Sequence, residues 1–138
     1  IIFGSGDLMA LNSEALTVIP SHDLWWRWMG AFGIAMLSLS LISTLALMFS
    51  AWLDNSVTPI VSVMAVIIVF TIIGLFDLPT FDAVKPFLFT THMISWKSFF
   101  EDPVPYNDII FSASVLLTHI VTLLLITLFY FKRKDITT

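Results

Sequence analysis

The sequence predicts an all-α membrane protein that crosses the bilayer several times. The chain of 138 residues is 58% hydrophobic and 12% charged, whereas soluble proteins average about 25% charged residues. Its mean hydropathy is +0.96. Three apolar stretches, placed at about 26–53, 57–76 and 109–131, each reach the roughly 20 residues that a helix needs to cross the hydrocarbon core. The polar remainder is too short to fold separately, so residues 1–138 are predicted to form a single transmembrane domain.

The first two spans are predicted to form a helical hairpin. One ionisable residue, Asp54, separates them, and Asn55 and Ser56 extend the turn. Pro59 follows shortly, and proline is tolerated in the first turn of a helix because its missing N–H would be unpaired there anyway. The hairpin therefore turns at a water-facing surface.

The residues ahead of the first span are predicted to lie outside the membrane. Residues 7–23 form a mixed polar loop whose acidic side chains belong in water. Tryptophans favour the membrane interface, and three of them surround Arg27: Trp25, Trp26 and Trp28. The chain starts without Met and without a basic stretch before an apolar core, so we expect it to be the middle of a longer protein, with residues 1–3 ending an earlier span.

Small and hydroxyl-bearing side chains on the first and last spans predict contacts with other helices. The residues concerned are Ser40, Ser43 and Thr44 in the first span, and Ser114, Thr118, His119 and Thr122 in the last. They either line a polar pathway or bond their own i−4 carbonyls. His119, near mid-depth, is either a functional group or a neutral imidazole bonded between helices.

The segment 77–108 is too polar to span the membrane, yet it is rich in aromatic residues. A freely solvated loop would not need them, so this external aromatic segment is expected to lie in the interface. Its prolines suggest two short helices, at 80–93 and 95–100. This hairpin either rests on the bilayer surface or re-enters the membrane.

The basic cluster Lys132, Arg133 and Lys134 directly follows the last span, which predicts a cytoplasmic C-terminus. Counting back places the turn at Asp54 on the same side and the segment 77–108 on the opposite side. The other three basic residues fall outside by this count, but Lys85 and Lys97 lie far from any span.

Catalytic and cofactor signatures are absent from the sequence. There is no glycine-rich phosphate loop, no His/Cys metal spacing and no evident Ser-His-acid set. A haem held by this chain alone is not expected, because only His119 falls within a span. The net charge of −4 argues against a nucleic-acid partner. We therefore expect no catalytic residue, no bound cofactor and no metal in this chain.

Two local signatures, within this order of elements, carry a resemblance to a known family. They are Phe49-Ser50-Ala51 with Asn55-Ser56 just after it, and the tail Phe131-Lys132-Arg133-Lys134-Asp135-Ile136. Over essentially its whole length the chain resembles the C-terminal half of a permease subunit of the type-2 ATP-binding-cassette (ABC) transporters, the export-permease family.

The resemblance implies a six-helix subunit of the cell membrane that pairs with a second permease copy and sits on two ABC ATPase subunits. ATP and Mg would bind in those partner chains. The spans here would be the fourth to sixth helices, with the residues of 81–100 as external re-entrant helices. The family's chief ATPase-docking elements have no counterpart in this chain. The resemblance implies an external gate formed by Phe87, Phe89 and Trp96. It also implies secondary cytoplasmic contacts, at Asp54, Asn55, Lys132, Arg133 and Lys134.

Two other functions fit the sequence. Three helices without acidic intramembrane residues are also compatible with a non-catalytic anchor or assembly subunit of a membrane oxidoreductase. A stand-alone small membrane scaffold would need the native chain to begin near Ile1. A pathway lined by Ser, Thr and Leu identifies neither the substrate nor the direction of transport.

Overall fold

The computed structural model describes residues 8–11 and 16–135, and the side chains of residues 19–134. The expected end of an earlier span at residues 1–3 lies outside the described residues. Within them, three long helices dominate: α1 (Leu24–Trp52), α2 (Thr58–Leu75) and α5 (Tyr106–Asp135). All three are long and apolar enough to cross a membrane. The predicted spans are confirmed to within a few residues at each end.

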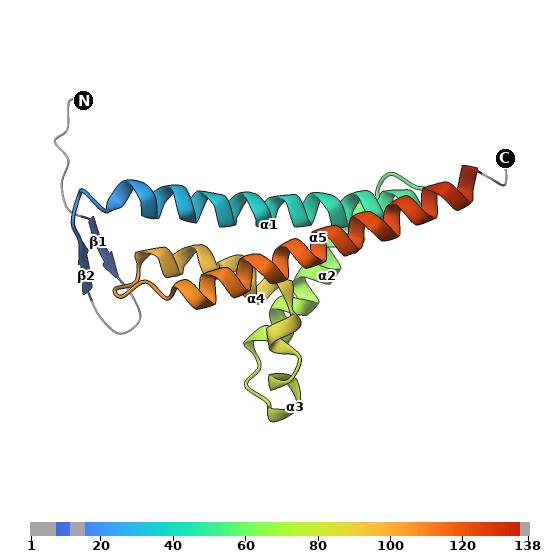
Figure 1. Cartoon of the computed structure of the whole chain (residues 1–138). Helices are drawn as coiled ribbons and strands as arrows, with labels where there is room; N and C mark the ends of the chain where they lie inside the picture. Colours follow the sequence, from blue (N-terminus) through green and yellow to red (C-terminus); the bar gives the residue numbers. More distant parts are fainter. Residues whose placement is uncertain (1–7, 12–15, 136–138) are drawn as a thin grey trace.

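The three long helices are not equivalent in length or packing. At 1.5 Å per residue, the 29 residues of α1 and the 30 residues of α5 extend about 45 Å each, and the 18 residues of α2 only about 27 Å. Figure 1 shows α1 and α5 lying side by side, with α2 angled away from the pair. The closest packing in the molecule accordingly joins α1 to α5.

A β-hairpin occupies part of the predicted polar loop 7–23. Strand β1 (Leu8–Leu11) pairs antiparallel with β2 (Leu16–Ile19), and Leu8 lies opposite Ile19. The prediction of a mixed polar loop was therefore wrong for these eight residues, which form strands. The reason is that both strands are short apolar runs, and the second carries β-branched residues that favour extended backbone.

The external aromatic segment forms four short helical turns. They are α3 (Pro79–Asp82), η1 (Lys85–Phe87), α4 (Phe89–Met93) and η2 (Ile94–Phe100). The predicted helix at 80–93 is divided into α3, η1 and α4, because Pro86, where a break was expected, has no N–H to donate and the backbone is extended at Leu88, between η1 and α4. The second predicted helix, at 95–100, is confirmed as η2.

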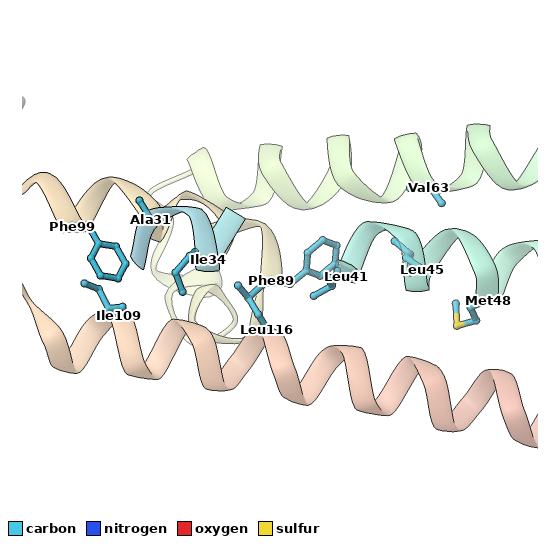
Figure 2. Packing of buried hydrophobic residues seen from close by; sticks show 10 residues of the cluster. All are labelled: Ala31, Ile34, Leu41, Leu45, Met48, Val63, Phe89, Phe99, Ile109 and Leu116. Atoms are coloured by element: carbon cyan, nitrogen blue, oxygen red, sulfur yellow. The ribbon is translucent and has the colours of Figure 1, made fainter. Parts of the chain in front are cut away.

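The hydrophobic core is built between α1 and α5 and includes residues from the external segment. Figure 2 shows the buried side chains of α1, from Ala31 to Met48, in one cluster with Ile109 and Leu116 of α5. Leu41 and Leu116 are fully buried at its centre. Phe89 of α4 and Phe99 of η2 belong to the same cluster, so the external segment is packed into the bundle.

Candidate functional site

The candidate site is the stretch 88–100, which comprises Leu88, α4 and η2 and is called the inserted segment below. Its Phe89 is only 4% exposed. The Phe89 ring lies 5.3 Å from the ring of Phe70 on α2 and 5.9 Å from the ring of His119 on α5. His119 lies thirteen residues beyond the start of α5, which is about 20 Å along the helix. The segment therefore packs between the long helices, and its re-entry into the membrane stays a prediction.

Arg27 fixes the far end of the inserted segment to α1. Its Nη1 donates to the carbonyl oxygens of Phe99, at 3.2 Å, and Glu101, at 2.9 Å. Positive charge is favourable at the C-terminal end of a helix, where carbonyls lack partners. The side chain is 6% exposed, and its guanidinium carbon lies 5.4 Å from the ring centre of Trp26. Among the described residues no carboxylate pairs with Arg27, so carbonyl dipoles and an aromatic face hold this buried cation.

Gly30 makes room for the same end of the segment. A Cβ atom built on Gly30 would lie 2.3 Å from Cε1 of Phe99. The Phe99 ring is 8% exposed and packs edge-on against Trp26, with 6.3 Å between ring centres. The close approach of η2 to α1 therefore requires glycine at this position.

A buried hydrogen-bond chain joins the inserted segment to α5. His92 lies 2.9 Å from Ser112 Oγ through Nδ1, and 2.8 Å from the carbonyl oxygen of Pro86 through Nε2. Ser95 Oγ donates to Ser112 Oγ at 2.7 Å. Because the Pro86 carbonyl only accepts, Nε2 carries the proton, and in a neutral ring Nδ1 accepts from Ser112. Every member of the chain is thus satisfied with His92 neutral.

Replacing Ser112 with alanine is expected to destabilise the protein by about 1–3 kcal/mol, since it removes the donor to buried His92 and the acceptor for Ser95. The measurement is unfolding by SDS titration in mixed micelles, followed by circular dichroism. Ser114→Ala is the matched control, because Ser114 is exposed on the same helix and bonds only its own i−4 carbonyl. Equal losses in the two variants would contradict the role given to the network.

An exposed ion-pair cluster precedes the inserted segment. Lys85 Nζ lies 2.7 Å from Oδ1 of Asp77 and 3.2 Å from Oδ1 of Asp82. The hydrogen bond from Lys85 lowers the pKa of Asp77, and the hydrogen bond to Asp77 raises the pKa of Lys85. A lowered carboxyl pKa means that the pair stabilises the fold above the ordinary aspartate pKa, and that this contribution is lost as the pH falls through the lowered value.

Lys85→Gln is expected to raise the pKa of Asp77 toward the ordinary aspartate range, because the charged hydrogen-bond donor is removed. Carboxyl-carbon NMR of the labelled protein across acidic pH measures this midpoint. Lys97→Gln, which removes a lysine that does not contact Asp77, is expected to leave the midpoint unchanged. An Asp77 midpoint that does not move in Lys85→Gln would show that the ion pair is absent in solution.

The hydroxyls predicted to line a pathway bond their own helices. Each donates to the carbonyl four residues earlier, over 2.7–2.9 Å: Ser40, Ser43, Thr44, Ser114, Thr118 and Thr122. The Nδ1 of His119 lies 2.8 Å from the carbonyl of Val115 in the same way. Thr44 is buried and the other five hydroxyl residues are exposed. In the described part of the chain, no hydrogen bond joins the hydroxyls of α1 to those of α5.

The three aromatic residues predicted as a gate do not come together. Phe89 is buried between α2 and α5, whereas Phe87 is 73% exposed. Trp96 packs edge-on against Phe100, with 6.4 Å between ring centres, and Lys97 Nζ lies 6.0 Å from the centre of the Trp96 ring. Phe89 has ring contacts with two of the long helices, through Phe70 of α2 and His119 of α5.

The residues predicted to face the cytoplasm do share one end of the molecule. Lys134 Nζ lies 3.5 Å from Oδ1 of Asp54, and the rings of Trp52 and Tyr130 are 6.0 Å apart. Asn55 accepts from the N–H of Val57 and stabilises the turn locally. Lys132 and Arg133 are exposed on the last turns of α5.

Sequence reasoning missed the residues that hold the inserted segment in place. Arg27 was placed only among the interfacial tryptophans, and His92 was given no role. The one available signal was a lone arginine among tryptophans, because Phe99, which Arg27 contacts, and Ser112, which His92 contacts, lie 72 and 20 positions away in the chain. No group of three or more His, Cys, Asp or Glu that could hold a metal ion occurs in the described part of the chain.

These features define the class: an all-α protein whose described residues include three helices suited to span a membrane and a helical segment inserted between them. The family model of DUF2705, a protein of unknown function, matches residues 1–137. The chain therefore belongs to the DUF2705 family. No curated protein and no solved structure matches the chain at a significant level.

Proposed function

We propose that this chain belongs to a transmembrane permease subunit of an ABC transporter, which moves a substrate by using ATP hydrolysed in a separate ATPase subunit. The observation that carries the proposal is the inserted segment between the last two long helices, since the resembled permeases place re-entrant helices at that point. The two local sequence signatures are the second support.

In this proposal Phe89 alone is the gating contact, because Phe87 is exposed and Trp96 packs against Phe100. Phe89 touches α2 through Phe70 and α5 through His119. A relative movement of α2 and α5 must break or re-form one of these ring contacts. The opening of a path between α2 and α5 would therefore change the contacts of the Phe89 ring.

The ends of α1 and α5 give the proposal its orientation. The pairs Asp54–Lys134 and Trp52–Tyr130 hold these two ends together, and the basic tail favours the cytoplasmic side of a cell membrane. In the proposed subunit, Asn55 and the tail Lys132–Lys134 lie near the ATPases as secondary contacts. The residues with exposed hydroxyls on α1 and α5 are proposed to line the pathway together with a second permease copy.

The first experiment is affinity purification of the full-length native protein in mild detergent, with mass spectrometry and an ATPase assay on the co-purifying chains. A nucleotide-binding subunit with vanadate-sensitive ATP hydrolysis is expected. Recovery of redox subunits with haem absorbance or quinone dependence would instead establish the oxidoreductase anchor. Recovery of neither would overturn the transporter proposal.

A variant pair then tests the gating contact within the purified complex. Phe89→Ala is expected to lower vanadate-sensitive ATP hydrolysis several-fold, because the coupling between α2 and α5 is lost. Phe87→Ala removes an equally large but exposed ring and is expected to leave hydrolysis unchanged. Equal activities of both variants and the native complex would remove Phe89 from the mechanism.

A further inference from the structure

A cavity of about 290 Å³ lies between the last turns of α2 and the inserted segment. The residues that line it are uncharged: Ile67, Thr71, Gly74 and Leu75 on α2, and Thr90, Thr91, Met93 and Ile94 on the inserted segment. Leu75 and Ile94 are more than half exposed, so the cavity is open to the surroundings of the protein. For a helix that is apolar enough to span a membrane, these surroundings are lipid.

One hydroxyl group on the wall of this cavity is buried without a partner. Thr90 is 7% exposed, and its Oγ1 forms no hydrogen bond with any described residue. Thr71, on the α2 wall, differs because its hydroxyl donates to the carbonyl oxygen of Ile67 at 2.7 Å. A buried hydroxyl without a partner costs free energy, which a molecule from outside the chain recovers by forming the hydrogen bond.

The break in the backbone before α4 explains why Thr90 lacks an acceptor within the chain. A threonine in a helix ordinarily donates to the carbonyl four residues earlier. For Thr90 that carbonyl belongs to Pro86, before the extended backbone at Leu88, and its oxygen lies 2.8 Å from Nε2 of His92. Helical threonines use two side-chain rotamers, so the hydroxyl is able to turn toward an acceptor inside the cavity.

The chemistry of the cavity fits an uncharged hydrogen-bond acceptor on an apolar chain. Because no charged side chain lines it, the cavity would not compensate the charge of a phosphate or an ammonium group. The 18 residues of α2 extend about 27 Å, close to the roughly 30 Å of the hydrocarbon core, so its last turns lie near the edge of the hydrocarbon. The ester carbonyls of glycerolipids lie at this level of a bilayer.

We propose that this cavity binds one glycerolipid, whose ester carbonyl accepts a hydrogen bond from Thr90 and whose acyl chain lies against Ile67 and Met93. A lipid is favoured over a water molecule because the cavity is predominantly apolar and far larger than one water molecule. The proposal does not depend on the transport function.

The test compares two phosphatidylcholines of equal chain length, one with ester-linked and one with ether-linked chains, because the ether lipid lacks the carbonyl. Each is titrated onto the delipidated full-length protein in non-ionic detergent, and native mass spectrometry measures the binding. We expect the ester lipid to bind about fivefold more tightly, the contribution of one neutral hydrogen bond. Thr90→Val keeps the shape of the side chain without the hydroxyl and is expected to abolish this preference.

Two control variants separate this hydrogen bond from general lipid binding. Thr71→Val removes a hydroxyl from the same cavity, but one that is already bonded within its own helix, and is expected to keep the preference for the ester lipid. Thr90→Ser retains the hydroxyl and is likewise expected to keep it. Circular dichroism verifies that each variant retains its helices.

Three results would overturn the proposal: equal affinity of the native protein for the two lipids, a preference that survives Thr90→Val, or a preference that is lost in either control variant. The first result would mean that water, or no molecule, meets the Thr90 hydroxyl. The second would place the ester at another site. The third would mean that the preference depends on the shape of the cavity and not on this hydrogen bond.

Discussion

Gly30→Ala is expected to destabilise the protein by about 1–3 kcal/mol, the usual cost of forcing extra volume into a packed site. The new Cβ would lie 2.3 Å from Phe99 Cε1. The ring cannot retreat freely, because it packs against Trp26 and the core cluster that includes Ala31 and Ile109. We therefore expect η2 to move away from α1. Unfolding by SDS titration in mixed micelles measures the loss.

Gly33→Ala is the matched control for this prediction. It lies one turn further along α1, and a Cβ added there meets no atom within 4 Å. Alanine is a better helix former than glycine by up to about 1 kcal/mol, so this variant is expected to be unchanged or slightly more stable. If Gly30→Ala were as stable as Gly33→Ala, the close packing of η2 on α1 would be wrong.

Arg27→Met is expected to cost about 3 kcal/mol or more, because charged hydrogen bonds of this kind contribute about 1.5–3 kcal/mol each and two carbonyls lose their donor. Methionine keeps an apolar stem of similar length, so the loss isolates the guanidinium. The end of the inserted segment is then expected to detach from α1 while the long helices persist.

Limited proteolysis measures this detachment directly. Glu101 accepts from Arg27 through its carbonyl, and the only other glutamate in the sequence is Glu14. Cleavage after Glu101 by a glutamate-specific protease is expected to accelerate in Arg27→Met. Lys97→Met, an exposed substitution on the same segment, is expected to change stability by less than about 0.5 kcal/mol. Unaltered cleavage in Arg27→Met would mean that the two hydrogen bonds do not hold the segment.

The Gly30 and Arg27 predictions concern the same structural unit, the inserted segment. Arg27 and Gly30 hold the C-terminal end of the inserted segment on α1, while His92 and Ser95 hold its middle on Ser112 of α5. The segment thus bridges the two most closely packed helices. Phe89 extends the same bridge to α2.

The three spans could be read from the sequence because the signal for a membrane helix is local. Each span needs only about 20 apolar residues in a row, and the predicted bounds agree with α1, α2 and α5 to within a few residues. The sequence signal for the turn at Asp54 is likewise local. The self-bonded hydroxyls, such as Thr118 to the Ser114 carbonyl, also follow from spacing within one helix.

The candidate site could only be decided by the tertiary structure. Whether residues 88–100 rest on a surface or enter the bundle depends on contacts such as Arg27 to Phe99, which are separated by 72 positions in the chain. No periodicity links such residues, since periodicity reports one helix at a time. The sequence by itself thus determined how many helices are apolar enough to span a membrane. Only packing between distant segments decided that Phe89 lies buried among them, while Phe87, two residues away, is exposed.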